Sequence, residues 1–222
     1  QKNGKPLGLL QDEGYLTDVR TAVAGAICAK YLAPNNIQAI GIIGTGVQAR
    51  MQLEYLKSVT DCRSAIVWGR SKSALDQYRT SMADSGFIIE TTMALDQVTD
   101  NCNLIVTCTA SEKPLIIKDQ IKGKIHITAM GSDTPNKQEL DSNVLSKADL
   151  VIADSRSQCE VRGEIHHAIK NKIVSMDSIV ELGEIINGDR QGRTTGSALT
   201  VADLTGVAVQ DIQISKAVLS NI

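Results

Sequence analysis

The sequence predicts an α/β protein built on a doubly wound parallel sheet, and three observations support this fold class. Strand-like apolar segments alternate with amphipathic helix-like segments along most of the chain, as they do in consecutive βαβ units. Aromatic residues make up only 3% of the 222 residues, so Ile, Val, Leu and Ala must form the core, which favours a sheet buried on both faces. The third observation is a glycine-rich turn within residues 39–50.

The glycine-rich turn is the most informative motif in the chain. Residues 39–50 read AIGIIGTGVQAR, a short apolar strand that leads through a Gly-x-Gly-x-x-Ala turn into a helix. Gly44 allows the tight turn, Gly46 lets the backbone approach a pyrophosphate, and Ala49 lets the helix pack closely on the strand. Because the first amides of the helix would face a diphosphate and a second strand follows at residues 64–68, we predict a Rossmann-type dinucleotide-binding site.

The other elements are predicted in chain order from hydrophobic periodicity and turn residues. A strand-like segment at residues 7–10 precedes a helix at residues 17–32, which begins at the N-cap Thr17 and ends before Pro34. Short apolar runs predict strands at residues 37–43, 64–68, 87–90, 103–107, 124–129 and 149–153. Amphipathic stretches predict helices at residues 47–58, 73–84, 138–147, 160–169, 175–187 and 207–219. The turn-like segment 187–196 is a candidate hinge or domain crossing.

Charge, hydropathy and cysteine usage exclude several classes of protein. A formal net charge of −2 gives no reason to expect nucleic acid or an anionic membrane as a partner. No apolar run reaches the roughly 18 residues of a membrane span, and no signal peptide is visible. The 5 cysteines contain no CxxC pair, which predicts reduced thiols in a cytoplasmic protein and no zinc site. His126, His166 and His167 have no metal-ligand spacing, so we expect no metal and assign them no role.

The end of the second predicted strand indicates which dinucleotide the chain prefers. NAD enzymes usually place Asp or Glu there to bind the ribose 2′-hydroxyl, whereas NADP enzymes lack this acid and add a cation. This chain has Gly69 at that point, followed by Arg70 and Ser71. Arg can bind a phosphate bidentately and Ser can donate a further hydrogen bond. We predict NADP(H) as the preferred cofactor and NAD(H) as the alternative, although a solvated basic turn would have the same sequence.

Small polar residues follow two further strands, at the edge where ligands of open α/β sheets bind. Residues 107–109 read TCT after one strand, and they either line the cofactor or form a plain βα loop. After the next strand, Gly131 would permit close approach to a nicotinamide, and Asp133 offers a carboxylate that could orient a protonated imine. Asp133 is equally well explained as a turn residue ahead of Pro135.

The first predicted helix carries Arg20 among apolar neighbours. Such an arginine either extends its charged end to solvent or is held for an anionic ligand, and the residues alone favour the first explanation. The chain also begins at Gln1, in the middle of an element, and one strand and one helix cannot form a domain. We therefore expect that an N-terminal portion of the protein precedes this sequence.

Taken together, these residues resemble the ornithine cyclodeaminase/μ-crystallin family. The resemblance is carried by residues 18–22, 41–50, 130–140, 181–184 and 200–211. It implies a homodimer in which each chain has a Rossmann domain and a second domain for substrate binding and dimerisation. Residues 1–35 would then be the remnant of this second domain, residues 36–198 the NAD(P)-binding domain, and residues 199–222 a C-terminal helix that returns to the substrate domain.

The resemblance also implies roles for single residues. Arg20 falls on an arginine that binds the substrate carboxylate, and Asp133 matches the catalytic aspartate of the cyclodeaminase. Thr205 and Gly206 fall on a loop that approaches the substrate. Cofactor-contacting positions are implied for Thr21, Gly44, Thr45, Gly46, Val47, Gln48, Gly69, Arg70, Ser71, Thr107, Cys108, Thr109, Met130 and Ser132.

The chain combines features of two branches of this family. It has Asp133, as the cyclodeaminase does, but Gly69 in place of that enzyme's NAD-selecting acid, and it has Arg70, as NADPH-using ketimine reductases do. This mixture is similar to bacterial members that reduce cyclic imino acids. We therefore expect NAD(P)H-dependent reduction of a cyclic imino acid, with Δ1-pyrroline-2-carboxylate to L-proline as the best single candidate. The alternatives are ornithine cyclodeamination with retained NAD, an alanine-type dehydrogenation, and a non-catalytic NADP-binding protein.

Overall fold

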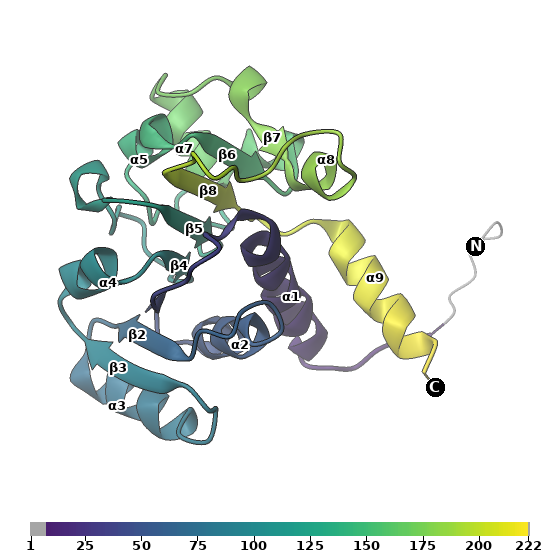
Figure 1. The fold of residues 1–222 in the computed structure, drawn as a ribbon. Helices are drawn as coiled ribbons and strands as arrows, with labels where there is room; N and C mark the ends of the chain where they lie inside the picture. Colours follow the sequence, from purple (N-terminus) through teal and green to yellow (C-terminus); the bar gives the residue numbers. More distant parts are fainter. Residues whose placement is uncertain (1–7, 222) are drawn as a thin grey trace.

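The computed structural model describes residues 8–221 and confirms the α/β class (Figure 1). Eight strands within these residues form one sheet in the order β3-β2-β1-β4-β5-β8-β6-β7, and every neighbouring pair is parallel. The strands are β1 (Ile40–Ile43), β2 (Ser64–Trp68), β3 (Ile88–Thr92), β4 (Leu104–Thr107), β5 (Ile125–Ala129), β6 (Leu150–Ala153), β7 (Val180–Glu181) and β8 (Leu199–Asp203). The chain order reverses between β1 and β4, where open sheets of this type bind ligands.

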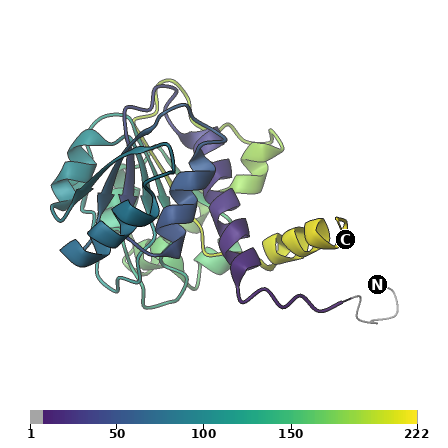
Figure 2. The same cartoon turned by 90° about the horizontal axis from the view of Figure 1, so that it is seen from below.

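Helices cover both faces of the sheet. They are α1 (Tyr15–Leu32), α2 (Val47–Leu56), α3 (Lys72–Ser81), α4 (Leu95–Asn101), α5 (Ser142–Lys147), α6 (Arg156–Cys159), α7 (Gly163–Lys170), α8 (Leu182–Ile186) and α9 (Ala208–Leu219), with short 3₁₀ turns η1 (Lys118–Gln120) and η2 (Met176–Ser178). Figures 1 and 2 show α9 leaving the body of the molecule beside α1. Within residues 8–221, no helix is long and apolar enough to cross a membrane.

The strand sequences divide their side chains between two cores. Successive strand residues point to opposite faces, so Ile42 belongs to the core that includes residues of α1, α2 and α8, while Ile43 belongs to the core that includes residues of α4, α5 and α7. In the same way, Val106 and Ile105 of β4 belong to opposite cores. Because both faces are covered, the strands read as continuous apolar runs, and this is why most of them could be predicted.

The first helix packs closely because its inner face consists of small residues. Ala22, Ala26 and Ala29 are buried there, and a Cβ atom added to Gly25 would lie 2.0 Å from the side-chain oxygen of Gln52 in α2. The predicted N-cap Thr17 is wrong, because α1 begins two residues earlier, after Gly14 at φ 89°. There the Asp12 carboxylate accepts the Leu16 N–H at 2.7 Å and so satisfies a free amide of the first turn.

The C-terminal part of the sheet differs from the sequence-based expectation. Residues 199–203 form β8 between β5 and β6, although residues 199–222 were expected to form only a returning helical segment. The apolar run is short and ends in Asp203, which is buried and accepts the Ile165 N–H at 2.8 Å. The loop over 187–198 is not a domain crossing, since it joins α8 to β8 of the same sheet. Its Arg193 donates to the backbone carbonyls of Leu32, Ser197 and Ile125.

Several predicted boundaries also need correction. Leu7 lies outside the described residues, and residues 8–10 carry no strand. The predicted helix 160–169 begins only at Gly163, which has φ 90°, as α7, and the short helix α6 before it was not predicted. The predicted helix 175–187 is the series η2, β7 and α8, while α4 was not predicted. The predicted helix 138–147 begins only at Ser142, because Asp141 caps it by accepting the Asn143 N–H.

Candidate active site

A cavity of about 210 Å³ lies at the carboxyl ends of β5 and β8, close to the amino end of α2. It is lined by residues from five elements: Thr17, Asp18, Arg20, Thr21, Ala24, Gln48, Met130, Asp133, Leu204, Thr205, Gly206 and Gln210. The structure therefore brings together seven predicted site residues that are far apart in the sequence.

A larger hollow of about 640 Å³, lined by Lys30 and Arg193 among others, lies at the opposite edge of the sheet. Because ligands of open α/β sheets bind at the carboxyl edge, the smaller cavity is the candidate site.

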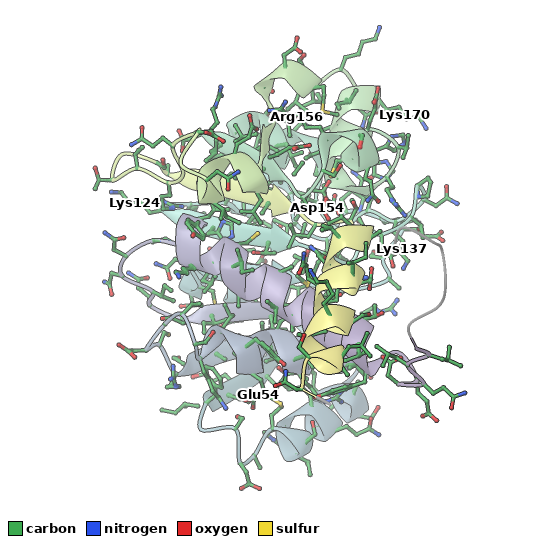
Figure 3. All side chains as sticks on the ribbon, turned by 90° about the vertical axis from the view of Figure 1, so that its right-hand side faces the viewer. Glu54, Lys124, Lys137, Asp154, Arg156 and Lys170 are labelled. Atoms are coloured by element: carbon green, nitrogen blue, oxygen red, sulfur yellow. The ribbon has the colours of Figure 1, made fainter. Side chains whose placement is uncertain are left out.

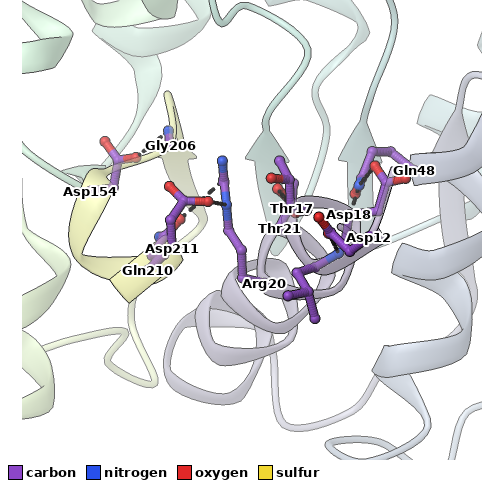
Figure 4. A network of polar contacts seen from close by, with 11 residues as sticks. Asp12, Thr17, Asp18, Arg20, Thr21, Gln48, Asp154, Gly206, Gln210 and Asp211 are labelled. Atoms are coloured by element: carbon purple, nitrogen blue, oxygen red, sulfur yellow. Dashed lines mark hydrogen bonds and ion pairs between the residues drawn. The ribbon is translucent and has the colours of Figure 1, made fainter. Parts of the chain in front are cut away.

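Arg20 projects from α1 toward the start of α9 (Figure 4). Its Nε donates to the Asp211 carboxylate at 3.0 Å, and its Nη1 donates to the Gln210 side-chain oxygen at 3.2 Å. Only 17% of the Arg20 side chain is exposed, so it does not extend into solvent as the sequence alone had favoured. Within the described residues its Nη2 makes no hydrogen bond, and the side chain borders the cavity. A guanidinium whose Nε and Nη1 are held while its Nη2 remains without a partner among these residues is suited to donate to a carboxylate at Nη2.

The turn at Thr205 and Gly206 faces Arg20, and hydrogen bonds to the Asp154 carboxylate hold this turn in place. The Gly206 N–H donates to the Asp154 carboxylate at 2.7 Å, and the Thr205 hydroxyl donates to it at 3.2 Å. Gly206 has φ 80°, and an added Cβ atom would lie 3.0 Å from Arg20 Nη1. Figure 3 shows Asp154 beside the end of α9 that leaves the sheet. Burial raises the pKa of Asp154. Sequence reasoning missed Asp154, although its place directly after a predicted strand could have indicated it.

The glycine turn has the geometry that a diphosphate needs. Gly44 has φ 131°, and an added Cβ atom would lie 2.9 Å from the Cys108 carbonyl oxygen. An added Cβ atom at Gly46 would meet nothing within 4 Å, so the backbone is open to an incoming group. No side chain caps α2, which leaves its first amides free to bind an anion. Gln48 also donates to the Asp18 carboxylate at 2.9 Å and so ties α2 to α1 (Figure 4).

The end of β2 has little room for an acidic side chain. An added Cβ atom at Gly69 would lie 2.8 Å from Thr45 Cγ2 and 3.0 Å from Leu75 Cδ2. Arg70 is exposed, and it forms no ion pair within residues 8–221. Ser71 is the N-cap of α3 and accepts the Ala74 N–H at 3.3 Å. A free guanidinium therefore stands at the position that distinguishes the two dinucleotides.

The loops after β4 and β5 are held by two buried glutamates that the sequence analysis did not identify. Glu139 accepts hydrogen bonds from the Thr107 hydroxyl, the Thr109 N–H and the Gly131 N–H. Glu164 accepts one from the Ser132 hydroxyl at 2.5 Å. The hydroxyls of Thr107 and Ser132 are thus bound inside the protein, whereas Met130 lines the cavity. Burial raises the pKa of Glu139, and it raises that of Glu164 to about 7.

Asp133 stands at the rim of the cavity. Its carboxylate accepts from Lys137 Nζ at 2.6 Å, and its side chain is 54% exposed. Asp133 and Arg20 both line the cavity. The catalytic role of Asp133 stays a prediction, because the residue also belongs to the turn that precedes Pro135.

The histidines and cysteines lie outside this cavity. His126 is fully buried, and its ring nitrogens lie 2.8 and 2.9 Å from the hydroxyls of Thr200 and Thr128. Burial lowers the pKa of His126 to about 3. All five cysteines are free thiols. In the part of the chain that the structure describes, no group of three His, Cys, Asp or Glu side chains could hold a metal ion.

The parallel sheet, the glycine turn and the cavity at the carboxyl edge define a Rossmann-type α/β protein. Residues 1–222 match the ornithine cyclodeaminase/mu-crystallin family, and the chain belongs to this family. An uncharacterized cyclodeaminase of Sinorhizobium fredii is 39% identical over 216 residues, which are 96% of this chain and 65% of that protein. Alanine dehydrogenase of Archaeoglobus fulgidus is 35% identical over 221 residues, which are 99% of this chain and 67% of that protein. The chain thus spans about two thirds of the length of these relatives.

Solved structures of related proteins have the same fold. Iminosuccinate reductase of Paracoccus denitrificans in complex with NAD⁺ has a TM-score of 0.88 and 35% identity, covering 93% of this chain and 63% of its own. A dimeric archaeal alanine dehydrogenase with bound NAD has a TM-score of 0.92 and 33% identity, covering 100% of this chain and 70% of its own. Δ1-pyrroline-2-carboxylate reductase of Thermococcus litoralis with NADH and L-proline has a TM-score of 0.91 and 27% identity, covering 97% of this chain and 67% of its own.

Proposed function

We propose that the chain provides the dinucleotide-binding part of an oxidoreductase that reduces the C=N bond of a small imino acid. The observation that carries this proposal is the single cavity in which Arg20 and Asp133 lie beside the amino end of α2. The open backbone at Gly46 and the uncapped first turn of α2 fit a dinucleotide diphosphate. A bound NAD(P)H would supply the hydride for the reduction.

Arg20 is proposed to bind the substrate carboxylate. Asp211 and Gln210 hold its Nε and Nη1, so its Nη2 remains to donate a charge-assisted hydrogen bond to a carboxylate. The Thr205–Gly206 turn, fixed by Asp154, closes the same side of the cavity. A substrate bound in this way would present its imine carbon to the cofactor in one position and orientation. This positioning should supply much of the rate enhancement.

Asp133 is proposed to act on the imine nitrogen. A carboxylate near this nitrogen stabilises the positive charge of a protonated imine, which makes the adjacent carbon a better hydride acceptor. Asp133 is exposed at the rim of the cavity, where its carboxylate pairs with Lys137. The same carboxylate could exchange a proton with the product amine.

The cofactor is proposed to be NADP(H), with NAD(H) as the alternative. The support for NADP(H) is the exposed Arg70 and the crowded position of Gly69, where an acid would contact Thr45 and Leu75. The support for NAD(H) is that the related iminosuccinate reductase and Δ1-pyrroline-2-carboxylate reductase are described with NAD⁺ and NADH.

The substrate is proposed to be a cyclic imino acid, with Δ1-pyrroline-2-carboxylate as the leading candidate. A cavity of about 210 Å³ with one carboxylate-binding arginine fits a small ring that carries one carboxylate. The relatives favour three other candidates, namely iminosuccinate, the alanine/pyruvate pair and a diamino acid that is cyclised with loss of ammonia.

The decisive experiment follows NAD(P)H absorbance with the enzyme and each substrate in turn. We expect net oxidation of NADPH with Δ1-pyrroline-2-carboxylate. Faster oxidation with iminosuccinate, or with pyruvate and ammonium, would assign a different substrate. Release of ammonia from ornithine without net change in absorbance would assign a cyclodeaminase. Dinucleotide binding without turnover of any of these compounds would contradict an enzymatic function.

We also propose the division of the chain and its assembly. Residues 208–221 would belong with a second domain, because α9 leaves the sheet and exposes Val209 and Ile212 to 55% and 57%, whereas α1 packs in a core of the sheet. The homodimer is supported by the dimer described for the archaeal alanine dehydrogenase. A reducing, cytoplasmic location is supported by the five free thiols.

A further inference from the structure

Glu139 connects the ends of two neighbouring strands beneath the candidate site. Its Oε2 accepts the Thr107 hydroxyl at 2.7 Å and the Gly131 N–H at 2.9 Å. Its Oε1 accepts the Thr109 N–H at 2.6 Å. Thr107 and Thr109 lie at the end of β4, and Gly131 follows β5, so one carboxylate fixes both loops. The side chain is completely buried and has no cation among these partners.

The two loops that Glu139 fixes are packed against each other as closely as their backbones allow. An added Cβ atom at Gly131 would lie 2.2 Å from the Thr109 carbonyl oxygen and 2.5 Å from Glu139 Oε2. There is consequently no space for a side chain between the loops and the carboxylate. A shift of Glu139 would therefore move both loops together.

A second buried glutamate holds Glu139 in place. Glu164, near the start of α7, accepts the Glu139 N–H at 2.8 Å, the Leu140 N–H at 3.0 Å and the Ser132 hydroxyl at 2.5 Å. The Glu139 carbonyl oxygen is also bound, by the Leu115 and Ile116 N–H groups at 2.7 and 3.1 Å. The backbone of Glu139 is therefore fixed by hydrogen bonds that do not involve its side chain, and this limits the movement of the carboxylate.

The loops lie on one side of the glycine turn, which locates the part of the dinucleotide that they would contact. In this fold the dinucleotide extends across the crevice at the carboxyl ends of the strands, with its diphosphate on the turn after β1. Gly69 and Arg70 at the end of β2 lie on the adenosine side. The loops after β4 and β5, on the other side of β1, lie under the nicotinamide side.

We propose that Glu139 is a positioning residue for the nicotinamide half of the bound dinucleotide. This inference rests on the proposed dinucleotide site but not on the identity of the imino acid. Glu139 does not line the cavity itself. It acts through the backbone of Thr109 and Gly131, and it thereby positions the neighbouring Met130, whose side chain lines the cavity. It holds the surface on which the ring must lie flat for hydride transfer, whereas Arg70 and the glycine turn bind the other half.

The substitution Glu139→Gln tests this inference. The variant keeps the volume of the side chain but replaces one acceptor with an NH₂ group. In one orientation this group faces the Thr109 N–H, and in the other it faces the Gly131 N–H and the Thr107 hydroxyl. Both orientations place donor against donor, so the two loops must separate.

The measurement compares two ligands that differ only in the nicotinamide half. The Kd values of the reduced dinucleotide and of the corresponding ADP-ribose are determined by titration calorimetry, for wild type and variant. We expect Glu139→Gln to raise the Kd of the dinucleotide about tenfold while the Kd of ADP-ribose stays within about twofold. Glu160→Gln, at an exposed glutamate of the same chain, is the matched control and should change neither value.

The other outcomes are equally informative. An equal loss of affinity for both ligands would overturn the inference, because it would show a general structural role, and unchanged affinities would overturn it as well. If wild type bound neither ligand, the proposed dinucleotide site itself would be wrong. Thr107→Val removes one of the three donors at constant volume and serves if Glu139→Gln does not fold. It should weaken the dinucleotide selectively by a smaller factor, and an unselective effect would again overturn the inference.

Discussion

At the scale of single residues, the guanidinium of Arg20 is shared between the protein and the cavity. Asp211 and Gln210 bind its Nε and Nη1, and its Nη2 would donate to the substrate carboxylate. We expect Arg20→Lys to raise the KM for the imino acid about 10- to 100-fold with a smaller effect on kcat, because a lysine cannot form both sets of hydrogen bonds. Steady-state kinetics at saturating cofactor measure this change. Arg79→Lys, in an exposed ion pair with Asp76, is the control. An unchanged KM would remove Arg20 from the substrate site.

Asp133 should affect turnover rather than affinity. We expect Asp133→Asn to lower kcat about 100-fold with little change in KM, because the amide keeps the size but loses the charge that stabilises a protonated imine. Asp119→Asn, at an exposed carboxylate away from the cavity, should have full activity. Full turnover of Asp133→Asn would show that the residue is only part of the turn before Pro135.

Arg70 should decide between the two dinucleotides. Its guanidinium is exposed and has no ion-pair partner in the described part of the chain, so the 2′-phosphate of NADP(H) can bind it. We expect Arg70→Ala to raise the KM for NADPH about tenfold and to leave that for NADH unchanged. An equal change for both cofactors, measured at constant ionic strength, would contradict the assigned selectivity.

At the scale of elements, Gly25 and Gly46 differ in the space around them: an added Cβ atom would clash at Gly25 but meets nothing within 4 Å at Gly46. Gly25 lets α1 pack on α2, and we expect Gly25→Ala to lower the free energy of unfolding by about 1–3 kcal/mol, because the Gln52 amide that it would contact is buried and hydrogen-bonded. Gly46 has free space, so Gly46→Ala should leave stability nearly unchanged but raise the dinucleotide Kd at least about tenfold.

Urea denaturation and cofactor titration of both variants check this pair of expectations. Gly183→Ala is the control for the substitution itself, since an added Cβ atom there meets nothing within 4 Å in a helix far from the cavity. A destabilised Gly46→Ala variant, or a Gly25→Ala variant as stable as wild type, would contradict the packing described for α1 and α2.

At the scale of the whole molecule, buried carboxyl groups make stability depend on pH. Burial raises the pKa of Glu164 to about 7 and also raises the pKa values of Glu139, Asp154 and Asp203. A raised pKa means that the folded state binds more protons than the unfolded state. The free energy of unfolding should therefore fall as the pH rises from the ordinary carboxyl range through about 7, with Glu164 contributing on the order of 3 kcal/mol.

Chemical denaturation between pH 5 and pH 8 measures this dependence. In Glu164→Gln the free energy of unfolding should fall less steeply with pH than in wild type, because the amide does not titrate, even if the variant is less stable throughout. Glu160→Gln, at an exposed position, should follow the wild-type slope. Identical slopes for Glu164→Gln and wild type would show that Glu164 has an ordinary pKa.

The parts of the fold that could be predicted are those fixed by local sequence. The strands β1, β2, β4 and β6 are mainly apolar runs because both of their faces are buried, and their predicted positions agree with the structure to within a few residues. The strand β5 was also predicted, although it contains the buried polar residues His126 and Thr128. The strand β8 could not be predicted in this way, because its pattern includes Thr200 and Asp203. These two polar residues are buried only because Leu32, His126 and Ile165 supply their partners.

The candidate site divides in the same manner. The sequence by itself determined the fold class and the glycine turn, and with the family resemblance it indicated seven of the twelve residues that line the cavity. Small residues after strands and a lone arginine on an apolar helix are local signals. Only the tertiary structure decided that Arg20 is held by Asp211 rather than extended into solvent. It also decided that Glu139, Glu164 and Asp154 support the loops. A buried carboxylate has its place because of donors from distant segments, and no local pattern records those donors.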